Sequence, residues 1–555
     1  MRTKDRWYEN ATFYAIDVEA FADGDGDGVG DFRGLTDRLD YLQSLGVDCL
    51  WLLPFYPSPN RDNGYDVADY YGVDDPYGTL GDFVEFVHAA DDRGIRVIVD
   101  LVVNHTSDQH PWFQRARADP DSPYRDYYVW RGDPPEEPDP HRGPVFPGEE
   151  DAVWSYDEAA EAFYYHRFYH FQPDLNTANP AVREEIRKIM GFWLELGVSG
   201  FRVDAATLMI DNKGGLESTK LDDPHGVLRD MRQFVERRGE DAILLAEADD
   251  DPADLAAYFG DDGDEINVMM NFLLSAHLVL ALAEGEAEPI RRVVDLVPDP
   301  PGTGQWANFV RNYDELNLGR LPAADQQTVF EAFAPDEAMR IYGRGIRRRL
   351  APMLGGDRDR IELTYSLLFS LPGIPLVVYG DEIGMGEDLS LAGRNAVRTP
   401  MQWSDDPNAG FSSADQADLV RPVISGGEFG YESVNVAAQR GDPDSLFQWF
   451  SRLVRVREEC PEIGRGDCEV LDTDSPAVFA HRMVGHGGDS DGGSDLVAVH
   501  NLADEQVAVS LALDGDPVRL FGHNGGAEFE VDSAGDWRFH LDPHGYCWVR
   551  VGEGR

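Results

Sequence analysis

Short apolar runs alternate with longer amphipathic segments along the chain from Trp7 to about Cys460. The runs are rich in β-branched and aliphatic residues and end in polar residues, a pattern typical of buried parallel strands. We expect strands at residues 11–18, 49–53, 97–103, 200–203, 243–246, 307–310 and 375–378. The amphipathic segments predict helices between them, for example at residues 32–45, 80–93, 180–196 and 359–371. Strands that alternate with helices in this way predict a parallel sheet.

Three of the apolar runs lead into a carboxylate. Asp204 follows GFRV, Glu247 follows ILLA, and Asp314 lies in FVRNYDEL, while a fourth run, VIVDLVVNH, ends in Asn104 and His105. In a (β/α)8 barrel the carboxyl ends of all strands meet at one mouth, where active sites form. Because strand ends so distant in sequence meet only in a closed sheet, we predict the α/β class and a (β/α)8 barrel.

Two segments depart from the alternating pattern. Residues 105–171 follow the third predicted strand and are rich in Pro, Asp, Tyr and Trp, which indicates a loop-rich insertion with a functional role. After about Cys468 the pattern changes to short alternating runs with turns, which predicts an antiparallel β domain. The predicted organisation is therefore a barrel at residues 1–104 and 172–465, an insertion at 105–171 and a C-terminal β domain at 466–555.

The charge of the chain is extreme, with 103 acidic residues against 48 basic ones and a formal net charge of −55. The acidic residues are spread along the whole chain, and lysine is nearly absent. A surface adapted to high salt explains this better than a site for cations or basic partners, because salt screens the self-repulsion. We expect no nucleic-acid partner, since the negative field repels phosphates.

The apolar segments and the cysteines indicate where in the cell the protein is located. No stretch approaches 18 uninterrupted apolar residues, so we expect no membrane span. The first residues contain no apolar core of the signal-peptide type, which favours a cytoplasmic protein. Four cysteines without CxxC spacing indicate free thiols and neither disulfides nor a zinc site. A homo-oligomeric assembly stays open.

The chemistry of the strand-end carboxylates fits the cleavage of a glycosidic bond. That reaction needs one carboxylate that attacks or stabilises an oxocarbenium-like centre and one that protonates the leaving oxygen. Arg202 lies two residues before Asp204, on the same face of the strand, and would keep Asp204 ionised. The apolar residues before Glu247 would raise its pKa toward that of an acid. Each carboxylate alone is also consistent with a solvated surface group. Four strand ends, however, share the pattern of an apolar run followed by a polar residue, which favours a common site.

These motifs resemble those of glycoside hydrolase family 13, the α-amylase family. DLVVNH, GFRVDA, LLAEA and RNYDEL match the four regions of the family in order and spacing, and FQPDLN matches a fifth. The resemblance covers nearly the whole chain and is greatest to the trehalose synthase branch, as in WLLPFYPSP, NGYDVADYY and VRTPMQW. It implies Asp204 as nucleophile, Glu247 as general acid/base and Asp314 as stabiliser of the transition state.

The resemblance also implies a set of substrate contacts. Asp66, His105 and Arg202 would bind the sugar in the buried subsite, and Tyr65 would stack on its ring. Arg398 in VRTPMQW would pair with Asp66 and close that subsite. Closure suits an isomerase, because the cleaved glucose must turn and be linked again before water reaches the intermediate.

Three further contacts are expected near the mouth: Glu315, which would hold the acceptor glucose, Phe171, and Tyr313. Position 313 is Tyr where the family nearly always has His, so its hydroxyl would replace an imidazole hydrogen bond. After Glu247 the chain reads ADDDP, where trehalose synthases carry Asn and Trp. Both departures lie in the region that receives the acceptor.

The segment DGDGDGVGDF predicts a metal site. Asp23, Asp25, Asp27 and Asp31 alternate with other residues, and the Val29 carbonyl lies between them. Hard oxygen ligands in a Gly-rich turn suit Ca2+, with Mg2+ as the alternative and an acidic loop without metal as the plainer interpretation. A second Ca2+ site is implied by the resemblance only, with the ligands Asn104, Asp174 and Asp211.

Three functions follow from these observations. The first is a retaining α-glucosyl enzyme that interconverts maltose and trehalose, with side hydrolysis to glucose. The second is an α-glucosidase, similar to oligo-1,6-glucosidase, that hydrolyses short α-glucans. The third is a non-catalytic protein on the same barrel, but such a protein would be expected to have lost Asp204, Glu247 or Asp314, and all three are present.

Overall fold

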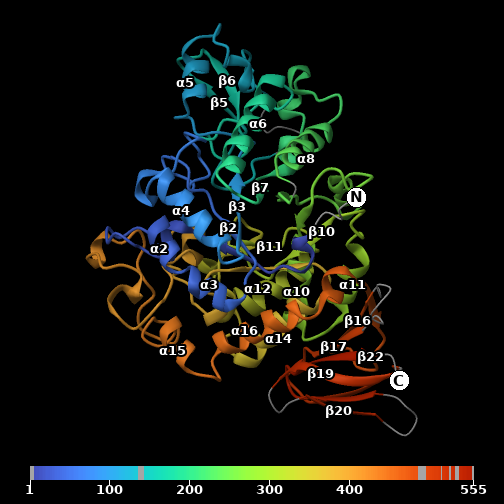
Figure 1. Cartoon of the computed structure of the whole chain (residues 1–555). Helices are drawn as coiled ribbons and strands as arrows, with labels where there is room; N and C mark the ends of the chain where they lie inside the picture. The colour runs from blue at the N-terminus through green and yellow to red at the C-terminus, as the bar shows by residue number, and fades with distance from the viewer. Residues whose placement is uncertain are drawn as a thin grey trace.

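The computed structural model describes residues 6–135, 143–239, 241–485, 495–513, 515–523, 527–531 and 537–552. Eight parallel strands close into a barrel in the order β1-β14-β10-β9-β8-β7-β3-β2, which confirms the predicted fold (Figure 1). The strands are β1 Phe13–Ile16, β2 Cys49–Leu52, β3 Arg96–Leu101, β7 Gly200–Val203, β8 Ile243–Ala246, β9 Val268–Met270, β10 Gln305–Asn308 and β14 Ile374–Val378.

Helices surround the barrel. The longer ones are α4 Leu80–Asp91, α6 Pro180–Glu195, α8 Gly226–Arg238, α10 Phe272–Glu284, α11 Glu288–Leu296, α12 Ala323–Phe333, α14 Arg358–Ser370 and α16 Leu446–Glu458. The shorter ones are α1 Val18–Phe21, α2 Phe32–Asp37, α3 Leu39–Leu45, α5 Pro111–Ala118, α7 Ala206–Met209, α9 Pro252–Leu255, α13 Leu350–Met353, α15 Val436–Gly441 and α17 Pro461–Arg465.

Two elements differ from the prediction. The helix expected at residues 32–45 is divided into α2 and α3, because Arg38 has φ −99° and ψ 2°, outside the helical range. The short strand β9 was not predicted. Its three residues, VMM, are too few to show a periodic pattern of apolar residues, although all three are buried.

The insertion forms a small layer of its own above the barrel mouth (Figure 1). It contains α5 and a three-stranded antiparallel sheet in the order β4-β6-β5. Val129, Val153, Trp154 and Tyr165 make a separate core beneath that sheet. The strands are β4 Trp130–Arg131, β5 Trp154–Asp157 and β6 Ala162–Tyr165.

The C-terminal segment is the predicted antiparallel β domain and lies beside α14 and α16 (Figure 1). A five-stranded sheet, β15-β16-β17-β22-β19, faces a three-stranded sheet, β18-β21-β20, across a second core. The strands are β15 Asp467–Leu471, β16 Val478–Val484, β17 Asp495–Asn501, β18 Val507–Leu511, β19 Asp516–Gly522, β20 Ala527–Val531, β21 Trp537–Leu541 and β22 Tyr546–Gly552.

A third small sheet borders the barrel mouth. It has the order β11-β13-β12 and follows β10, with β11 Leu316–Asn317, β12 Arg340–Ile341 and β13 Gly345–Ile346. Among the described residues, the helices are all too short or too polar to cross a membrane. The four cysteines are free thiols, as expected, and three of them are buried.

Candidate active site

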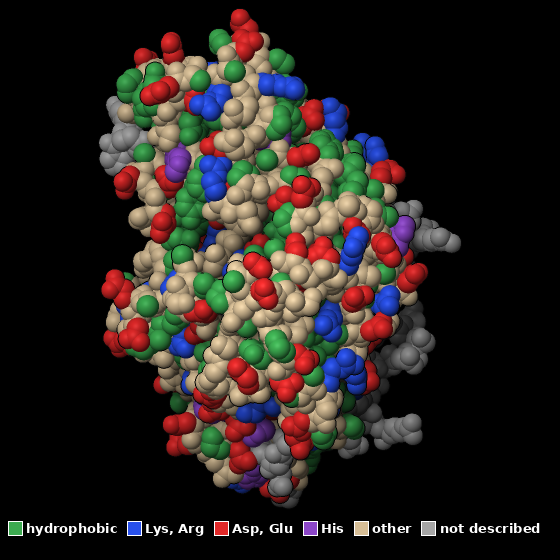
Figure 2. Space-filling view, turned by 90° about the vertical axis from the view of Figure 1, so that its left-hand side faces the viewer, with side chains coloured by type: hydrophobic (Ala, Val, Ile, Leu, Met, Phe, Trp, Pro, Cys, Tyr) green, Lys and Arg blue, Asp and Glu red, His purple; other side chains and the backbone are tan. Residues whose placement is uncertain are grey.

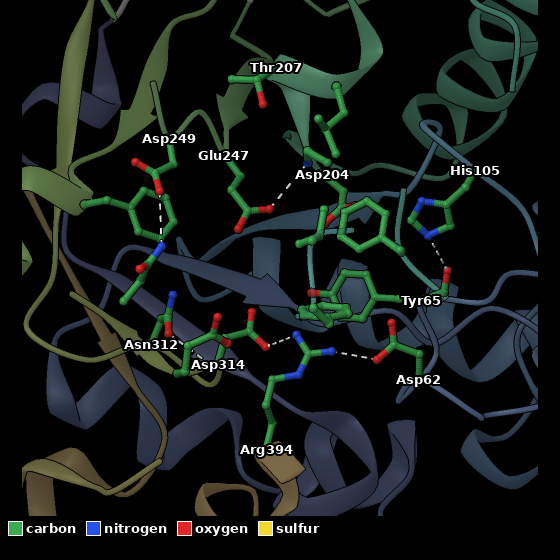
Figure 3. Close-up of a pocket in the computed structure, with 18 of the residues that line it drawn as sticks. Asp62, Tyr65, His105, Asp204, Thr207, Glu247, Asp249, Asn312, Asp314 and Arg394 are labelled. Atoms are coloured by element: carbon green, nitrogen blue, oxygen red, sulfur yellow. Dashed lines mark hydrogen bonds and ion pairs between the residues drawn. The ribbon is translucent and has the colours of Figure 1, made fainter. Parts of the chain in front are cut away.

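A cavity of about 200 Å3 lies at the carboxyl ends of the barrel strands and beneath the insertion. Figure 3 shows Asp204, Glu247, Asp314 and Asp62 around one space, with Arg394 between Asp314 and Asp62. It contains all three predicted catalytic carboxylates. Its lining residues are Asp62, Tyr65, His105, Val145, Phe146, Phe168, Asp204, Ala205, Thr207, Leu208, Glu247, Asp249, Phe272, Asn312, Asp314, Glu315, Asn317, Arg344 and Arg394.

The buried guanidinium of Arg202 joins three acids at the floor of this cavity. It donates to Oδ1 of Asp204, to Oε2 of Glu247 at 2.7 Å and to Oδ1 of Asp100 at 2.8 Å. Because two nitrogens of one guanidinium bind Asp204 and Glu247, the two carboxyl groups lie on the same side of the cavity. A retaining mechanism needs its two carboxyl groups to be close, about 5 Å apart. Oδ2 of Asp204 has no hydrogen-bond partner among the described residues and is left to react.

The backbone after Asp204 contributes to this arrangement. Ala205 has φ +47°, in the left-handed region that a residue with a Cβ seldom adopts. Its amide nitrogen donates to Oε2 of Glu247 at 3.3 Å. Backbone strain of this kind concentrates at functional sites, and here it aims an amide at the candidate acid.

Burial controls the ionisation of the two candidate catalytic groups. It raises the pKa of Glu247 to about 7, with Arg202 opposing the shift and the charges of Asp204 and Asp314 adding to it. The expected direction for Glu247 is thereby confirmed. Burial also raises the pKa of Asp204 to about 6, although Arg202 opposes it. Arg202 favours the ionised form of Asp204, as expected, but burial outweighs the cation and leaves the pKa above its usual value.

Asp314 has the opposite environment. Its Oδ1 accepts hydrogen bonds from Nη1 of Arg394 at 2.6 Å and from Nη2 of Arg398 at 2.8 Å. Burial raises the pKa of Asp314, but Arg394, Arg398 and Arg202 outweigh burial and hold this pKa below its usual value. Asp314 is therefore an ionised carboxylate at neutral pH, suited to stabilise a positive centre.

Several expected substrate contacts line the cavity. Tyr65 presents its ring, and its hydroxyl donates to Oδ2 of Asp100 at 3.2 Å. Nε2 of His105 lies 3.2 Å from the Tyr65 carbonyl oxygen, which orients the imidazole (Figure 3). Glu315 also lines the cavity, and its carboxylate lies 3.8 Å from the guanidinium of Arg344.

The predicted pair of Arg398 and Asp66 is wrong. Asp66 is buried outside the cavity wall, where it accepts hydrogen bonds from the Ser58 hydroxyl at 2.9 Å and from the backbone and side chain of Arg61. Arg398 binds Asp314 instead. The pair that closes the cavity is Asp62 with Arg394, whose Nη2 donates to Oδ1 of Asp62 at 2.6 Å (Figure 3).

Two further predicted contacts lie behind the wall. Tyr313 is buried, does not line the cavity, and shares a 2.7 Å hydrogen bond with the hydroxyl of Tyr65. Its ring packs at 5.0 Å from Trp51, so the larger side chain fills the space behind Tyr65. Phe171 stacks on Tyr169 with 5.0 Å between centroids and also lies outside the cavity wall.

The second predicted metal site is contradicted by Lys213. Its buried ammonium donates to the carbonyl oxygen and Oδ1 of Asn104 at 3.0 and 2.7 Å, and lies 3.0 Å from Oδ2 of Asp174. The third expected ligand, Asp211, lies 3.7 Å from Arg167. A dication is not expected among these oxygens, because the ammonium already neutralises them and would repel it.

The acidic loop after α1 retains the features of a cation site. Ligand oxygens of Asp23, Asp25 and Asp27 lie within 4.8 Å of one another. Asp31 has another role, because its carboxylate caps α2 through the amide of Gly34 at 2.7 Å and also accepts two amides of the loop. The amide nitrogen of Val29 donates to Asp27 at 2.8 Å.

Sequence reasoning missed Asp62, Asp100 and Arg394, and it placed Asp249 and Asn312 only within the acceptor region, with no role of their own. Asp100 lies inside the apolar run VIVDLVVNH. An acidic residue within a buried strand is rare and could have identified Asp100 as functional. Asp62 and Arg394 lie four residues from the chosen Asp66 and Arg398 along the chain. Asp249 lies in the altered segment after Glu247, and its carboxylate binds Asn317 and Arg320 at 3.1 and 2.7 Å.

Comparison with known proteins places this geometry among carbohydrate-active enzymes. The model of the α-amylase catalytic domain matches residues 16–299 and 345–466, and that of the sucrose hydrolase-like C-terminal domain matches residues 493–550. The chain is 41% identical to the trehalose synthase/amylase TreS of Mycolicibacterium smegmatis, covering 99% of this chain and 93% of that protein.

Two other proteins extend the comparison. A trehalose synthase of Pimelobacter sp. is 41% identical, with coverage of 98% of this chain and 96% of that protein. A solved structure of the trehalulose synthase MutB from Pseudomonas mesoacidophila superimposes with a TM-score of 0.76 at 27% identity, covering 98% of this chain and 99% of that one.

Proposed function

The chain belongs to the α-amylase family, glycoside hydrolase family 13, and from this premise we propose that it is a retaining α-glucosyl enzyme that interconverts maltose and trehalose. The observation that carries the proposal is the junction at Arg202, where one guanidinium binds Asp204 and Glu247 while Oδ2 of Asp204 stays free. The 41% identity to trehalose synthases over nearly the full chain selects this activity within the family.

The first half of the reaction cleaves maltose. Oδ2 of Asp204 attacks the anomeric carbon of the non-reducing glucose, and Glu247 gives its proton to the departing glycosidic oxygen. The bond from that carbon to the oxygen breaks, a glucosyl ester forms on Asp204, and free glucose remains in the cavity. Asp314, kept ionised by Arg394 and Arg398, stabilises the positive charge that develops in the transition state.

The second half reverses these roles with a different acceptor oxygen. After the free glucose turns, its anomeric hydroxyl attacks the glucosyl ester, and Glu247, now deprotonated, takes the proton. The product is the 1,1-linked disaccharide, and Asp204 is released as a carboxylate. Attack by water at the same step yields two glucose molecules, which is the side hydrolysis.

Contacts across the mouth support transfer over hydrolysis. Phe146 of the insertion stacks on Tyr342 of the β12–β13 turn, with 4.8 Å between centroids. Nη2 of Arg344 donates to the carbonyl oxygen of Val145 at 3.1 Å. We call these four residues the clasp. Because the clasp joins the insertion to the barrel over the cavity, it favours retention of glucose and exclusion of water.

A structural Ca2+ ion in the acidic loop is part of the proposal. The carboxylates of Asp23, Asp25 and Asp27 converge, and three hard anionic oxygens in an irregular turn suit Ca2+ better than Mg2+, which demands near-ideal octahedral geometry. The ion would supply no step of the reaction; it would hold the loop that the segment 411–420 contacts.

We also place the enzyme in a salt-rich cytoplasm. Free thiols are usual in reducing compartments, and all four cysteines are free. The net charge of −55 is spread over the chain, which suits a medium where salt screens repulsion over a few ångströms.

Incubation with maltose in molar KCl tests the function. Trehalose as the main product, separated from glucose by chromatography, is the expected result. Glucose as the only product would instead identify a hydrolase of short α-glucans. The observation that favours this second function is Asp249 in the cavity wall. Asp204→Ala is expected to abolish both transfer and hydrolysis. If this variant kept more than a trace of activity, the assignment of Asp204 as the nucleophile would be refuted.

A further inference from the structure

Arg394 is presented to the cavity by an irregular segment. Residues 379–435, all of which the structure describes, contain no strand and no α-helix. Arg394 lies in a single 3-10 turn, Gly393–Val397, yet its guanidinium must bridge Asp62 and Asp314 at 2.6 Å each. Such a segment lacks a ladder of backbone hydrogen bonds, so side-chain contacts must fix its position.

Arg347 and Arg349 bind backbone carbonyl oxygens on both sides of Arg394, and the neighbouring residue Asn395 adds the contact to the loop that carries Asp62. Oδ1 of Asn395 accepts a hydrogen bond from Nδ2 of Asn63 at 2.8 Å, and Asn63 directly follows Asp62. Its carbonyl oxygen accepts the amide of Arg398 at 3.1 Å. One amide side chain therefore ties the segment that carries Arg394 to the loop that carries the carboxylate partner of Arg394.

Arg421 anchors Asn395 to the barrel. Its Nη1 lies 3.4 Å from Oδ1 of Asn395 and 2.6 Å from Oε1 of Glu19. Its Nη2 donates to Oδ2 of Asp17 at 2.9 Å. Asp17 immediately follows β1, and Arg421 is buried, so the guanidinium joins the irregular segment to a fixed strand of the barrel.

We propose that Asn395 and Arg421 are positioning residues for the glucosyl transfer, which they serve by holding Arg394 between Asp62 and Asp314. The inference rests on the proposed function for its reaction but concerns residues that do not line the cavity. Without this support the backbone that carries Arg394 can shift, and only Asp62, Asp314 and the ring of Phe146, 5.2 Å away, hold the guanidinium. Asp314 then loses a charge-assisted partner at 2.6 Å, and the wall of the buried subsite opens.

The test compares Asn395→Ala with Asn395→Asp. The first removes the acceptor of both hydrogen bonds, and the second keeps an acceptor oxygen beside the cation of Arg421. We expect Asn395→Ala to lower kcat/KM by roughly tenfold to a hundredfold, mainly through kcat, because the interaction of Asp314 strengthens in the transition state. Asn395→Asp is expected to stay within about threefold of the parent enzyme.

A double-mutant cycle separates positioning from a general loss of structure. If Asn395 acts through Arg394, then Asn395→Ala adds less than about twofold to the loss already caused by Arg394→Ala. Asn435→Ala is the matched control, since Asn435 caps α15 at the end of the same segment without contacting Arg394. It should lower the melting temperature and leave kcat and KM unchanged.

The kinetics are measured on 4-nitrophenyl α-glucoside as well as on maltose. An equal loss from Asn395→Ala in both backgrounds, or no rescue by Asn395→Asp, would overturn the inference. If the parent enzyme forms only glucose from maltose, the proposed function fails, but the cycle on the aryl glucoside still decides whether Asn395 positions Arg394. Arg421→Lys gives a second variant, with an expected loss between those of the two Asn395 variants.

Discussion

Arginine side chains determine how the three carboxylates at the barrel mouth ionise. Arg202 binds both Asp204 and Glu247, but burial outweighs this cation and raises both pKa values. Asp314 has two further guanidinium partners, Arg394 and Arg398, and its pKa is lowered. The number of cationic partners therefore separates the carboxylates into two kinds. Asp204 and Glu247 lose their protons near neutral pH, and Asp314 stays an anion.

The first prediction is a narrow, bell-shaped dependence of kcat/KM for maltose on pH. Asp204 must be ionised to attack, so activity should rise through about pH 6; Glu247 must be protonated, so activity should fall through about pH 7. Because these acids interact, the two limbs report apparent pKa values of the group. Initial rates in buffers of constant ionic strength give the profile.

A substrate that needs no acid provides the control for this profile. With 2,4-dinitrophenyl α-glucoside the leaving group departs without protonation, so the alkaline limb should move upward while the acid limb stays. An alkaline limb that is the same for both substrates would mean that Glu247 is not the acid.

The sequence predicted the catalytic carboxylates well and their neighbours less well, for a physical reason. Asp204 and Glu247 follow buried strands directly, so the strand geometry dictates where they point. Asp62 lies in a turn just before Asn63, which has φ +50°. The hydrophobic pattern of a turn has no regular spacing, so it does not distinguish Asp62 from Asp66. Lys213 likewise reaches Asn104 from a distant loop, a contact that spacing does not encode.

At the scale of elements, length decided what could be predicted. Strands of four or five residues with continuous burial, such as β7, β8 and β14, were recognisable as apolar runs. The three residues of β9 were not. The irregular segment 379–435 carries Arg394 but has neither strand nor α-helix, so only its tertiary contacts reveal its role.

The clasp leads to a second prediction, about the partition between transfer and hydrolysis. Phe146→Ala removes the ring that stacks on Tyr342, so the insertion is held less firmly over the cavity and water gains access. We expect the ratio of glucose to trehalose formed from maltose to increase several-fold, with total maltose consumption within about threefold. Chromatography of initial products measures both quantities.

Tyr342→Phe is the matched control, because it keeps the stacked ring and should keep the product ratio of the parent enzyme. Tyr342 has φ +54°, so larger backbone changes at this position would confuse the result. An unchanged ratio in Phe146→Ala would show that the stack does not govern water access.

The acidic loop leads to a third prediction, about metal removal. The Ser412 hydroxyl donates to Oδ2 of Asp23 at 2.5 Å, and the amide of Val420 donates to the Gly28 carbonyl oxygen at 2.9 Å. A bound Ca2+ would therefore stabilise two segments at once. Chelation is expected to lower the melting temperature by roughly 2–5 °C. The double variant Asp25→Asn, Asp27→Asn should show no response, and an equal shift in both proteins would exclude this loop as the site.

At the scale of the whole molecule, the negative charge is a property of the surface rather than of one region. Figure 2 shows Asp and Glu side chains scattered over the visible face, with Lys and Arg side chains fewer and dispersed among them. Many of the arginines are engaged in local pairs, such as Arg320 with Asp249 at 2.7 Å and Arg93 with Asp40 at 2.8 Å. One-to-one pairing cannot neutralise the chain, since 103 acidic residues face 48 basic ones.

The fourth prediction follows from this excess: added salt should stabilise the protein. The Debye length falls from about 10 Å at 0.1 M salt to about 3 Å at 1 M, so the repulsion among surface carboxylates weakens faster than the short arginine–carboxylate pairs do. The melting temperature should therefore rise steadily between roughly 0.1 and 2 M KCl. Sucrose at equal osmolality is the control, because it favours compaction without screening charge. Equal stabilisation by KCl and sucrose, or a melting temperature independent of KCl, would contradict an electrostatic origin and with it the proposed salt adaptation.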